Sequence, residues 1–334
     1  MKKCYRYVCF FLLTAFFSGA CANLPRPAEG RRPPHRITSI DQMVQQVKQN
    51  NDDIEKFYTV DGDGQIIVRA QAQGASDDFD IVYDLHNAEA LENAAYRVRF
   101  TVQARKSTER REDNLIWMPR ADRAGILLSF DDDYTDSWER CFDLFDTYGA
   151  KVTFFVHGKP VPFCARAISR GHDIGYHSLS HIDLREIKRS AIASETVEPA
   201  QAFRQAGIPL RSFAYPFGFY QNWMHEILFR SFDILRGYGV TCRLYRENEI
   251  RSAFIASCSI DNTVIRGEEN FNRQIRLMLR AVKFLDGPLV LPLTTHDISD
   301  TAEWGISRRR LEFLLKTASE LSLMFYRYSD FSVD

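Results

Sequence analysis

The stretch that decides the fold is residues 125–134, which read Gly125-Ile126-Leu127-Leu128-Ser129-Phe130-Asp131-Asp132-Asp133-Tyr134. Its first six residues are nearly all apolar, which predicts a short strand buried on both faces. Three aspartates follow directly, at the point where such a strand reaches the edge of its sheet. The stretch therefore predicts a buried strand that carries carboxylates at its carboxyl end.

The same pattern recurs through the rest of the chain. Further apolar strands are predicted at Lys151–Val156, His172–His177, Arg211–Tyr215, Asp233–Arg236, Phe254–Ser257 and Leu289–Thr294. Helices are predicted between them, at Asp136–Tyr148, Ile187–Gln205, Gln221–Phe229 and Asn270–Asp286. This alternation predicts an α/β domain with a parallel sheet, either open or closed into a barrel.

Polar residues follow four of these strands. They are the three aspartates at 131–133, His177 with His181, the segment Pro216-Phe217-Gly218, and His296 with Asp297. The carboxyl ends of parallel strands meet on one side of a sheet or barrel, so we expect these groups to converge on one cleft.

Two histidines and a carboxylate can hold a metal and leave positions open for water and substrate. Zinc held in this way lowers the pKa of its water to about 7. A second aspartate can then accept a proton from that water, and a separate histidine can protonate the leaving group. The pattern indicates metal-assisted hydrolysis of an acyl bond. A helical zinc-protease motif is excluded because residue 178 is Ser, and there is no Gly-x-Ser-x-Gly motif of a serine hydrolase.

Residues 125–297 resemble the polysaccharide deacetylase family, the NodB-homology domain of carbohydrate esterase family 4. Ser129–Tyr134 is similar to the family's Thr-Phe-Asp-Asp-Gly motif, and Thr153–Val156 to its second strand. Gly171–His181 follows Gly-His-Glu-Ile-Gly-x-His-Ser/Thr-x-x-His. Tyr215–Gly218 fits Pro-Tyr/Phe-Gly, and Leu293–His296 fits Leu-x-x-His.

The resemblance implies a distorted (β/α) barrel of the NodB type that binds a divalent metal, usually zinc, with Co²⁺, Ni²⁺ or Mn²⁺ as alternatives. The implied metal ligands are Asp132, His177 and His181. Asp131 is implied as the general base and His296 as the general acid. The backbone N–H of Phe217 is implied as a donor to the tetrahedral oxyanion.

Three positions depart from the family pattern. Asp133 stands in place of Gly and is expected to add a third carboxylate near the metal. Ala214 stands in place of the Arg that holds the catalytic Asp in the family. Arg211 has the wrong strand parity to replace that Arg, whereas Arg236, at the end of the next strand, could reach the same carboxylate. The Asp that pairs with the acid His is not clearly placed, and Asp261 is a weak candidate.

The part of the chain before the barrel predicts a small, mainly β module over residues 37–104. Its expected elements are a helix at 37–48, a turn at 61–64 and strands at 65–69, 79–85 and 96–104. Residues 105–114 are densely charged, so we expect a solvated linker over 105–124, followed by the catalytic domain over 125–334.

Residues 1–22 have the features of a secretory signal peptide. A positive start precedes the apolar run Val8–Ala20, and small residues follow. Two processing sites compete: cleavage after Ala22, or cleavage before Cys21 with lipidation of that cysteine. The Pro/Arg-rich residues 23–36 would suit a tether. We expect export to the cell envelope or periplasm, with contact to a membrane only through the lipid anchor.

The composition bears on the class of binding partner and on disulfide bonding. With 43 Lys and Arg against 44 Asp and Glu, the net charge of −1 argues against nucleic acid. Four cysteines lie beyond the signal peptide: Cys141, Cys164, Cys242 and Cys258. They allow three disulfide pairings, and burial as free thiols is an equally good interpretation.

The leading hypothesis is an envelope hydrolase that deacetylates a polysaccharide containing N-acetylglucosamine. Esterase action on O-acetylated sugars is a close variant. The rival is a carbohydrate-binding lipoprotein that keeps the fold without catalysis. Aromatic residues near the site could stack on sugar rings: Tyr134, Tyr215, Phe219, Tyr220 and Trp223.

Overall fold

The computed structural model of the chain describes residues 39–48, 54–60, 66–72, 79–84, 89–90, 96–105, 107–117, 124–239, 242–251, 253–284 and 289–332. The expected signal peptide with Cys21, the tether at 23–36 and the turn at 61–64 lie outside the described residues.

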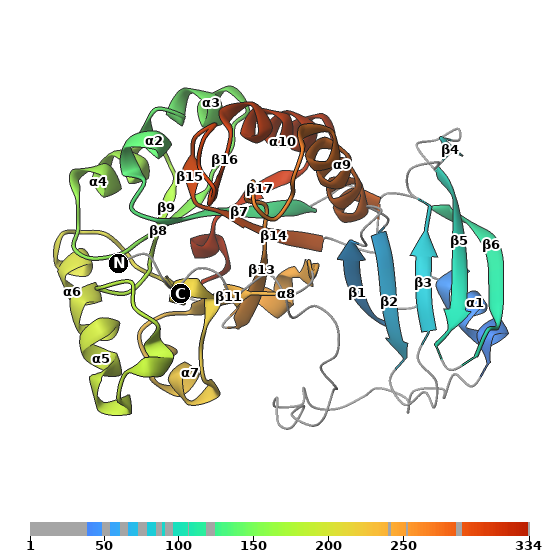
Figure 1. Cartoon of the computed structure of the whole chain (residues 1–334), viewed down its shortest axis with the longest axis horizontal. Helices are drawn as coiled ribbons and strands as arrows, with labels where there is room; N and C mark the ends of the chain where they lie inside the picture. Colours follow the sequence, from blue (N-terminus) through green and yellow to red (C-terminus); the bar gives the residue numbers. More distant parts are fainter. Residues whose placement is uncertain are drawn as a thin grey trace. The chain divides into compact units, whose positions relative to one another are not determined.

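The first part is an antiparallel sheet with one helix (Figure 1). Its strands are β1 (Ile54–Val60), β2 (Ile66–Ala72), β3 (Phe79–Tyr83), β4 (Glu89–Ala90), β5 (Tyr96–Ala104) and β6 (Arg110–Trp117), and its helix is α1 (Ile40–Lys48). The alternation predicted for β5 is confirmed, since buried Val98, Phe100 and Val102 alternate with exposed Arg97, Arg99 and Gln103 and half-buried Thr101.

The linker expected over 105–124 was wrong for residues 110–117. These residues form β6, which pairs antiparallel with β5 along eight residues, from Tyr96↔Trp117 to Gln103↔Arg110. Arg111 and Asp113 point to α1, where they meet Asp41 and Lys48 at 3.5 and 2.8 Å. The charged side chains of this segment therefore lie on the solvated surface of a sheet strand. The strand forms through pairing with a distant segment, which local composition does not indicate.

The second part is a closed barrel of seven parallel strands. They are β7 (Gly125–Asp132), β8 (Thr153–Val156), β9 (Asp173–Tyr176), β10 (Ser212–Ala214), β11 (Ile234–Tyr238), β13 (Phe254–Ser259) and β14 (Leu289–Thr295). Closure comes from β14, which pairs with β7 from Val290↔Gly125 to Thr295↔Phe130. Short strands join the rim: β12 (Tyr245–Arg246) on β14, and β17 (Met324–Tyr326) on the first half of β7. The predicted closed alternative is confirmed.

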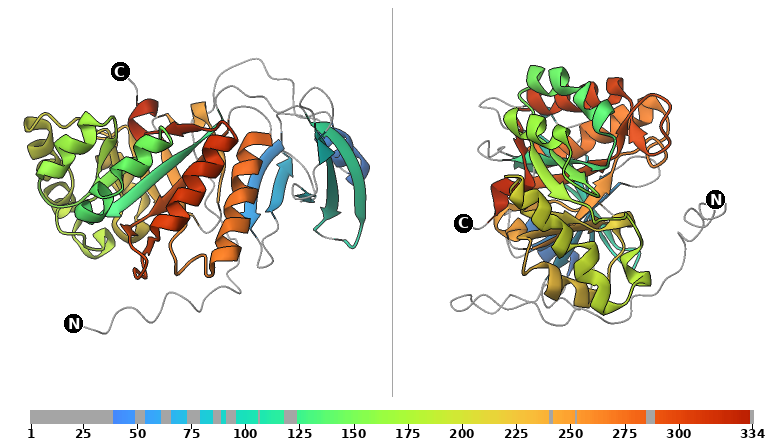
Figure 2. Two further views of the ribbon diagram at one scale, coloured as in Figure 1. Left: turned by 90° about the horizontal axis from the view of Figure 1, so that it is seen from above. Right: turned by 90° about the vertical axis from the view of Figure 1, so that its left-hand side faces the viewer.

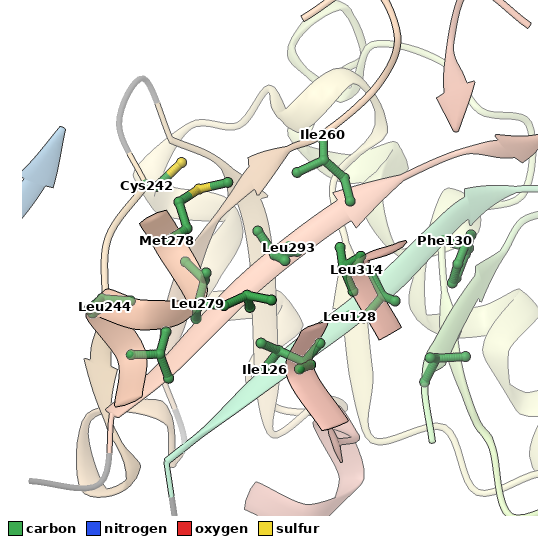
Figure 3. Packing of buried hydrophobic residues seen from close by; sticks show 14 of the residues in the cluster. Ile126, Leu128, Phe130, Cys242, Leu244, Ile260, Met278, Leu279, Leu293 and Leu314 are labelled. Atoms are coloured by element: carbon green, nitrogen blue, oxygen red, sulfur yellow. The ribbon is translucent and has the colours of Figure 1, made fainter. Parts of the chain in front are cut away.

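Two apolar clusters hold the barrel. The smaller one takes one residue from each of six strands: Leu127, Phe155, Ala214, Ile234, Ile255 and Val290. The seventh strand contributes Gly175, where an added Cβ would lie 2.3 Å from the Phe155 ring. The larger cluster packs the outer side chains of the strands against helices, as Ile126 and Leu128 do against Leu279 and Leu314 (Figure 3).

The helices are α2 (Thr135–Glu139), α3 (Phe142–Thr147), α4 (Pro162–Ser169), α5 (Ile192–Glu195), α6 (Val197–Gln205), α7 (Asn222–Leu228), α8 (Glu247–Ile250), α9 (Glu268–Phe284) and α10 (Arg308–Glu320). Figure 2 shows α9 and α10 side by side outside the strands. The single helix predicted over 136–148 is broken at Arg140, whose carbonyl accepts a hydrogen bond from Arg308. Among the described helices, none has the length and apolarity to cross a bilayer.

Candidate active site

The site lies where the barrel strands end. Ser129 and Asp131 share the inner face of β7 with Leu127, since alternate residues of a strand point the same way. The same rule puts Arg236 and Tyr238 on the inner face of β11. The strand ends therefore bring together six of the residues singled out from the sequence: Asp131, Asp132, His177, His181, Arg236 and His296.

Asp132, His177 and His181 form a group that fits a metal ion. One ligand atom from each lies within 4.8 Å of the others. The Oδ1 atom of Asp132 is 3.0 Å from His181 Nε2 and 3.6 Å from His177 Nε2. This oxygen is buried and has no partner with hydrogen-bond geometry. Two imidazole nitrogens around such a carboxylate oxygen suit zinc and similar divalent ions.

The surroundings prepare His177 for coordination. Its Nδ1 lies 2.8 Å from the Ala214 carbonyl, which accepts the ring proton and directs Nε2 into the group. Burial lowers the pKa of His177 to about 4, so its ring is neutral at physiological pH. Burial alone would raise the pKa of Asp132, but its electrostatic interactions with His181, His177 and His296 outweigh burial. The result is a pKa below the usual range for an Asp.

The backbone around this group is left-handed at several non-glycine residues. The φ angles are 83° at Asp132, 72° at Ser178, 50° at His181 and 58° at Phe217. Elsewhere among the described residues, only Ser322 is a non-glycine residue with a positive φ. Side chains rarely adopt this conformation, and such strain gathers at functional sites. These turns aim the ligands at one another, and the sequence alone did not indicate them.

Asp131 is held by Arg236. Both side chains are fully buried, and the Nη2 atom of Arg236 donates to both carboxylate oxygens of Asp131. Burial would lower the pKa of Arg236, but the Asp131 charge raises it above its ordinary value. Ala214 is the register partner of Arg236, so its small side chain leaves room for the guanidinium. The contact proposed between Arg236 and the first aspartate is present.

Tyr238 was missed by the sequence reasoning. Its hydroxyl lies 2.9 Å from Asp131 Oδ2 and 3.1 Å from His296 Nε2. It therefore touches both residues expected to move protons. The available signal was its position two residues after Arg236, on the same face of the strand.

Asp261, only a weak candidate from the sequence, is the partner of His296. Its Oδ2 lies 2.9 Å from His296 Nδ1, and its carboxylate also accepts from Thr295 Oγ1 and Ser259 Oγ. Burial would lower the pKa of His296, but the hydrogen bond and charge of Asp261 outweigh it, and the pKa rises to about 9. His296 is therefore suited to carry a proton at neutral pH.

Two expectations need correction. Tyr215 is fully buried beneath the rim, with its ring against Phe213 and Tyr220, so it cannot stack on a sugar. Asp133 does not join the metal group. It is largely exposed and lies 3.6 Å from His157 at the end of β8. Phe217, by contrast, lies at the site, with its ring 4.7 Å from that of His181.

Exposed aromatic rings border the site. Tyr134, Phe217 and Phe219 are each more than a third exposed, and so is Trp304, which the sequence reasoning also missed. The Trp304 ring lies 6.1 Å from that of His296. Tyr220 and Trp223 instead pack partly against the core.

Comparison with known proteins gives a family match. Residues 119–230 match the polysaccharide deacetylase family. The chain is 27% identical over 107 residues to a bifunctional xylanase/deacetylase of Pseudobutyrivibrio xylanivorans, covering 30% of this chain and 18% of that protein. It is 34% identical over 77 residues to a protein of Arthroderma benhamiae named "Probable peptidoglycan-N-acetylglucosamine deacetylase", covering 21% and 18%. The matched region thus spans about a fifth of each relative.

Solved structures are also similar. The Xyl-CE4 domain of a multidomain xylanase from the hindgut metagenome of Trinervitermes trinervoides is 19% identical, with a TM-score of 0.43 over 63% of this chain and 90% of that one. The peptidoglycan deacetylase PdaC of Bacillus subtilis is 15% identical, with a TM-score of 0.44 over 63% and 91%. The family match over residues 119–230 takes in Asp131, Asp132, both metal-group histidines and Phe217, and it identifies a polysaccharide deacetylase domain in this part of the chain.

Proposed function

We propose that the chain is a metal-dependent hydrolase that removes acetyl groups from an N-acetylated polysaccharide of the cell envelope, or from one exported by the cell. The observation that carries this proposal is the hydrogen-bonded connection of Asp131 to His296 beside the metal group. A base, an acid and an open ligand set in one place are what acyl hydrolysis requires.

Each residue has a distinct role in this proposal. Asp132, His177 and His181 would hold the metal, which supplies Lewis acidity and an activated water. Asp131 accepts a proton from the attacking water, and Arg236 keeps its carboxylate aimed. The Phe217 N–H stabilises the oxyanion. His296 donates its proton to the leaving nitrogen, and the products are acetate and a free amine on the sugar.

The exposed rings support a saccharide substrate. Tyr134, Phe217 and Trp304 offer flat apolar faces at the rim, and sugar rings stack on such faces through their C–H bonds. The names of both curated relatives include deacetylation, one of them on N-acetylglucosamine. An O-acetyl ester would fit the same machinery. Zinc is our proposal for the metal, with Co²⁺, Ni²⁺ or Mn²⁺ as alternatives.

We also propose that the protein is exported by the signal at its N-terminus, with cleavage before Cys21 and lipidation of that cysteine. A disulfide between Cys242 and Cys258 supports an oxidising compartment, while Cys141 and Cys164 are buried free thiols. We propose residues 125–334 as the catalytic domain and the antiparallel sheet with α1 as an accessory module.

The test is acetate release from N-acetylglucosamine oligomers, measured with and without chelator. We expect chelator-sensitive release that falls roughly 10²–10⁴-fold in Asp131→Asn and in His296→Ala, the usual value of a positioned proton-transfer group. Both variants should keep the metal. Oligomer binding by the wild type without acetate release would instead favour the non-catalytic carbohydrate-binding lipoprotein.

A further inference from the structure

Tyr238 packs closely between two residues of the barrel rim. The Arg236 guanidinium lies 4.9 Å from the centre of its ring. On another side is Gly218, where an added Cβ would come within 2.3 Å of the Tyr238 ring and 2.9 Å of its backbone nitrogen. Gly218 also has φ 70°, a conformation that favours glycine. The tyrosine hydroxyl is thereby directed to the two groups expected to transfer protons.

The donors and acceptors in this network leave one consistent arrangement. A carboxylate paired with a guanidinium only accepts hydrogen bonds, so the single Tyr238 proton points to Asp131 Oδ2. The phenol oxygen can then only accept from His296, so Nε2 must carry a proton. On the far side of the ring, Nδ1 faces Asp261 Oδ2, which already accepts from Ser259. Both nitrogens of His296 are therefore donors.

We propose that Tyr238 is a positioning residue whose hydroxyl oxygen holds the Nε2 proton of His296 until the leaving nitrogen of the substrate takes its place. This inference rests on the proposed deacetylase function, in which His296 is the acid. The phenol keeps its own proton throughout, because that proton remains on Asp131. Tyr238 therefore acts through His296 and does not itself transfer a proton.

The charges around His296 support this assignment. The groups that act on it are Asp261 after β13 and Asp131 and Asp132 at the end of β7, and its Nε2 contacts the Tyr238 hydroxyl of β11, whose neighbour Arg236 is paired with Asp131. The three carboxylates favour the imidazolium. Burial, followed by the charge of Asp131, raises the pKa of Tyr238 well above its ordinary value, so the phenol stays neutral.

The first test follows the imidazole directly by NMR in the full chain labelled with ¹⁵N-histidine. In the wild type we expect a slowly exchanging Nε2–H signal from His296 below its pKa. In Tyr238→Phe the signal should exchange rapidly, and the His296 titration should move down by about one to two pH units, the value of a hydrogen bond to a charged group. An unchanged titration, or a rapidly exchanging Nε2–H in the wild type, overturns the assignment. The wild-type measurement applies even if the variant does not fold.

The second test uses the reaction. Tyr238→Phe should keep its metal, lower kcat about tenfold or more, and shift the alkaline limb of the kcat profile to lower pH. Tyr176→Phe is the matched control, since its hydroxyl donates to the Gly158 carbonyl and lies outside this network. A loss of kcat with an unmoved alkaline limb would reduce Tyr238 to a packing role. Failure of the wild type to release acetate would count against the proposed function, while the NMR result would still decide the hydrogen bond.

Discussion

Ala214 of β10 and Arg236 of β11 are register partners in the barrel wall, and the larger side chain spans the interior to Asp131. The family pattern places an Arg where this chain has Ala214. The structure shows that the neighbouring strand carries a cation at the same level of the barrel instead. The two positions are adjacent, so one of them can supply the guanidinium if the other is small.

This relationship predicts the outcome of an exchange. Arg236→Ala leaves Asp131 buried without its partner, so we expect a stability loss of about 3–5 kcal/mol and a large loss of kcat with the metal retained. Adding Ala214→Arg should recover part of both, because the new side chain starts from the adjacent strand. Urea unfolding and kcat measure these effects. In an Asp131→Asn background, Arg236→Ala should lower kcat little further, whereas losses that multiply would mean that the two residues act independently.

The metal group predicts selective loss of the ion. His177→Ala and Asp132→Ala should each remain folded and lose the metal, because three protein ligands are the minimum that such a site uses. Asp133→Ala is the control, since this neighbouring carboxylate is exposed and directed to His157. Metal content of the purified proteins checks the prediction, and full occupancy in either ligand variant would contradict the assignment.

The Asp261–His296 pair predicts a pH dependence. The folded pKa of His296 is raised from 6.5 to about 9, so the stability that the pair provides is fully present below pH 6.5 and lost as the pH rises through 9. The acid form is lost over the same range. In Asp261→Asn we expect the alkaline limb of kcat at lower pH and a weaker fall in unfolding free energy between pH 6.5 and 9. Identical profiles in the two proteins would show that Asp261 does not set this pKa.

Trp304 predicts a contribution to saccharide binding. Gly305, which follows it, packs so closely on the Asp297 carbonyl that an added Cβ would lie 2.4 Å from that oxygen. Asn262 also donates to the Ala302 carbonyl and fixes the loop. Trp304→Ala should raise KM for oligosaccharides about 2- to 10-fold, the value of an aromatic contact, and leave a simple acetate ester unaffected. Phe229→Ala, another exposed aromatic, is the control. An equal effect on both substrates would argue against stacking.

The disulfide predicts an effect on the stability of the fold. Cys242 follows β11 and Cys258 lies in β13, with 16 residues of separation. Replacing both by Ser should lower the free energy of unfolding by about 3 kcal/mol, because the unfolded chain gains conformational entropy when the cross-link is absent. Urea unfolding of the double variant checks this, and reductant should destabilise the wild type but not the variant. Equal stability of the oxidised wild type and the double variant would mean that the bond does not stabilise the fold.

The sequence by itself determined the order of the barrel strands and the groups at their ends. Buried strands are short apolar runs, and the polar residues that follow them are local features of the chain. This is why β7, β9 and β14 could be predicted together with Asp132, His177, His181 and His296. The resemblance to a family added the roles that local pattern could not assign.

Only the tertiary structure decided which side chains meet. The contact of Arg236 with Asp131, which strand parity could only suggest, depends on barrel closure and register, and the bridge made by Tyr238 depends on the same geometry. Two predictions were wrong: a sugar-stacking role for Tyr215 and a linker over 110–117. Tyr215 is buried and residues 110–117 form a strand, because both pack against residues distant in sequence. The physical reason is the same in each case: periodicity records whether a position is buried, whereas partners across a barrel are set by non-local strand pairing.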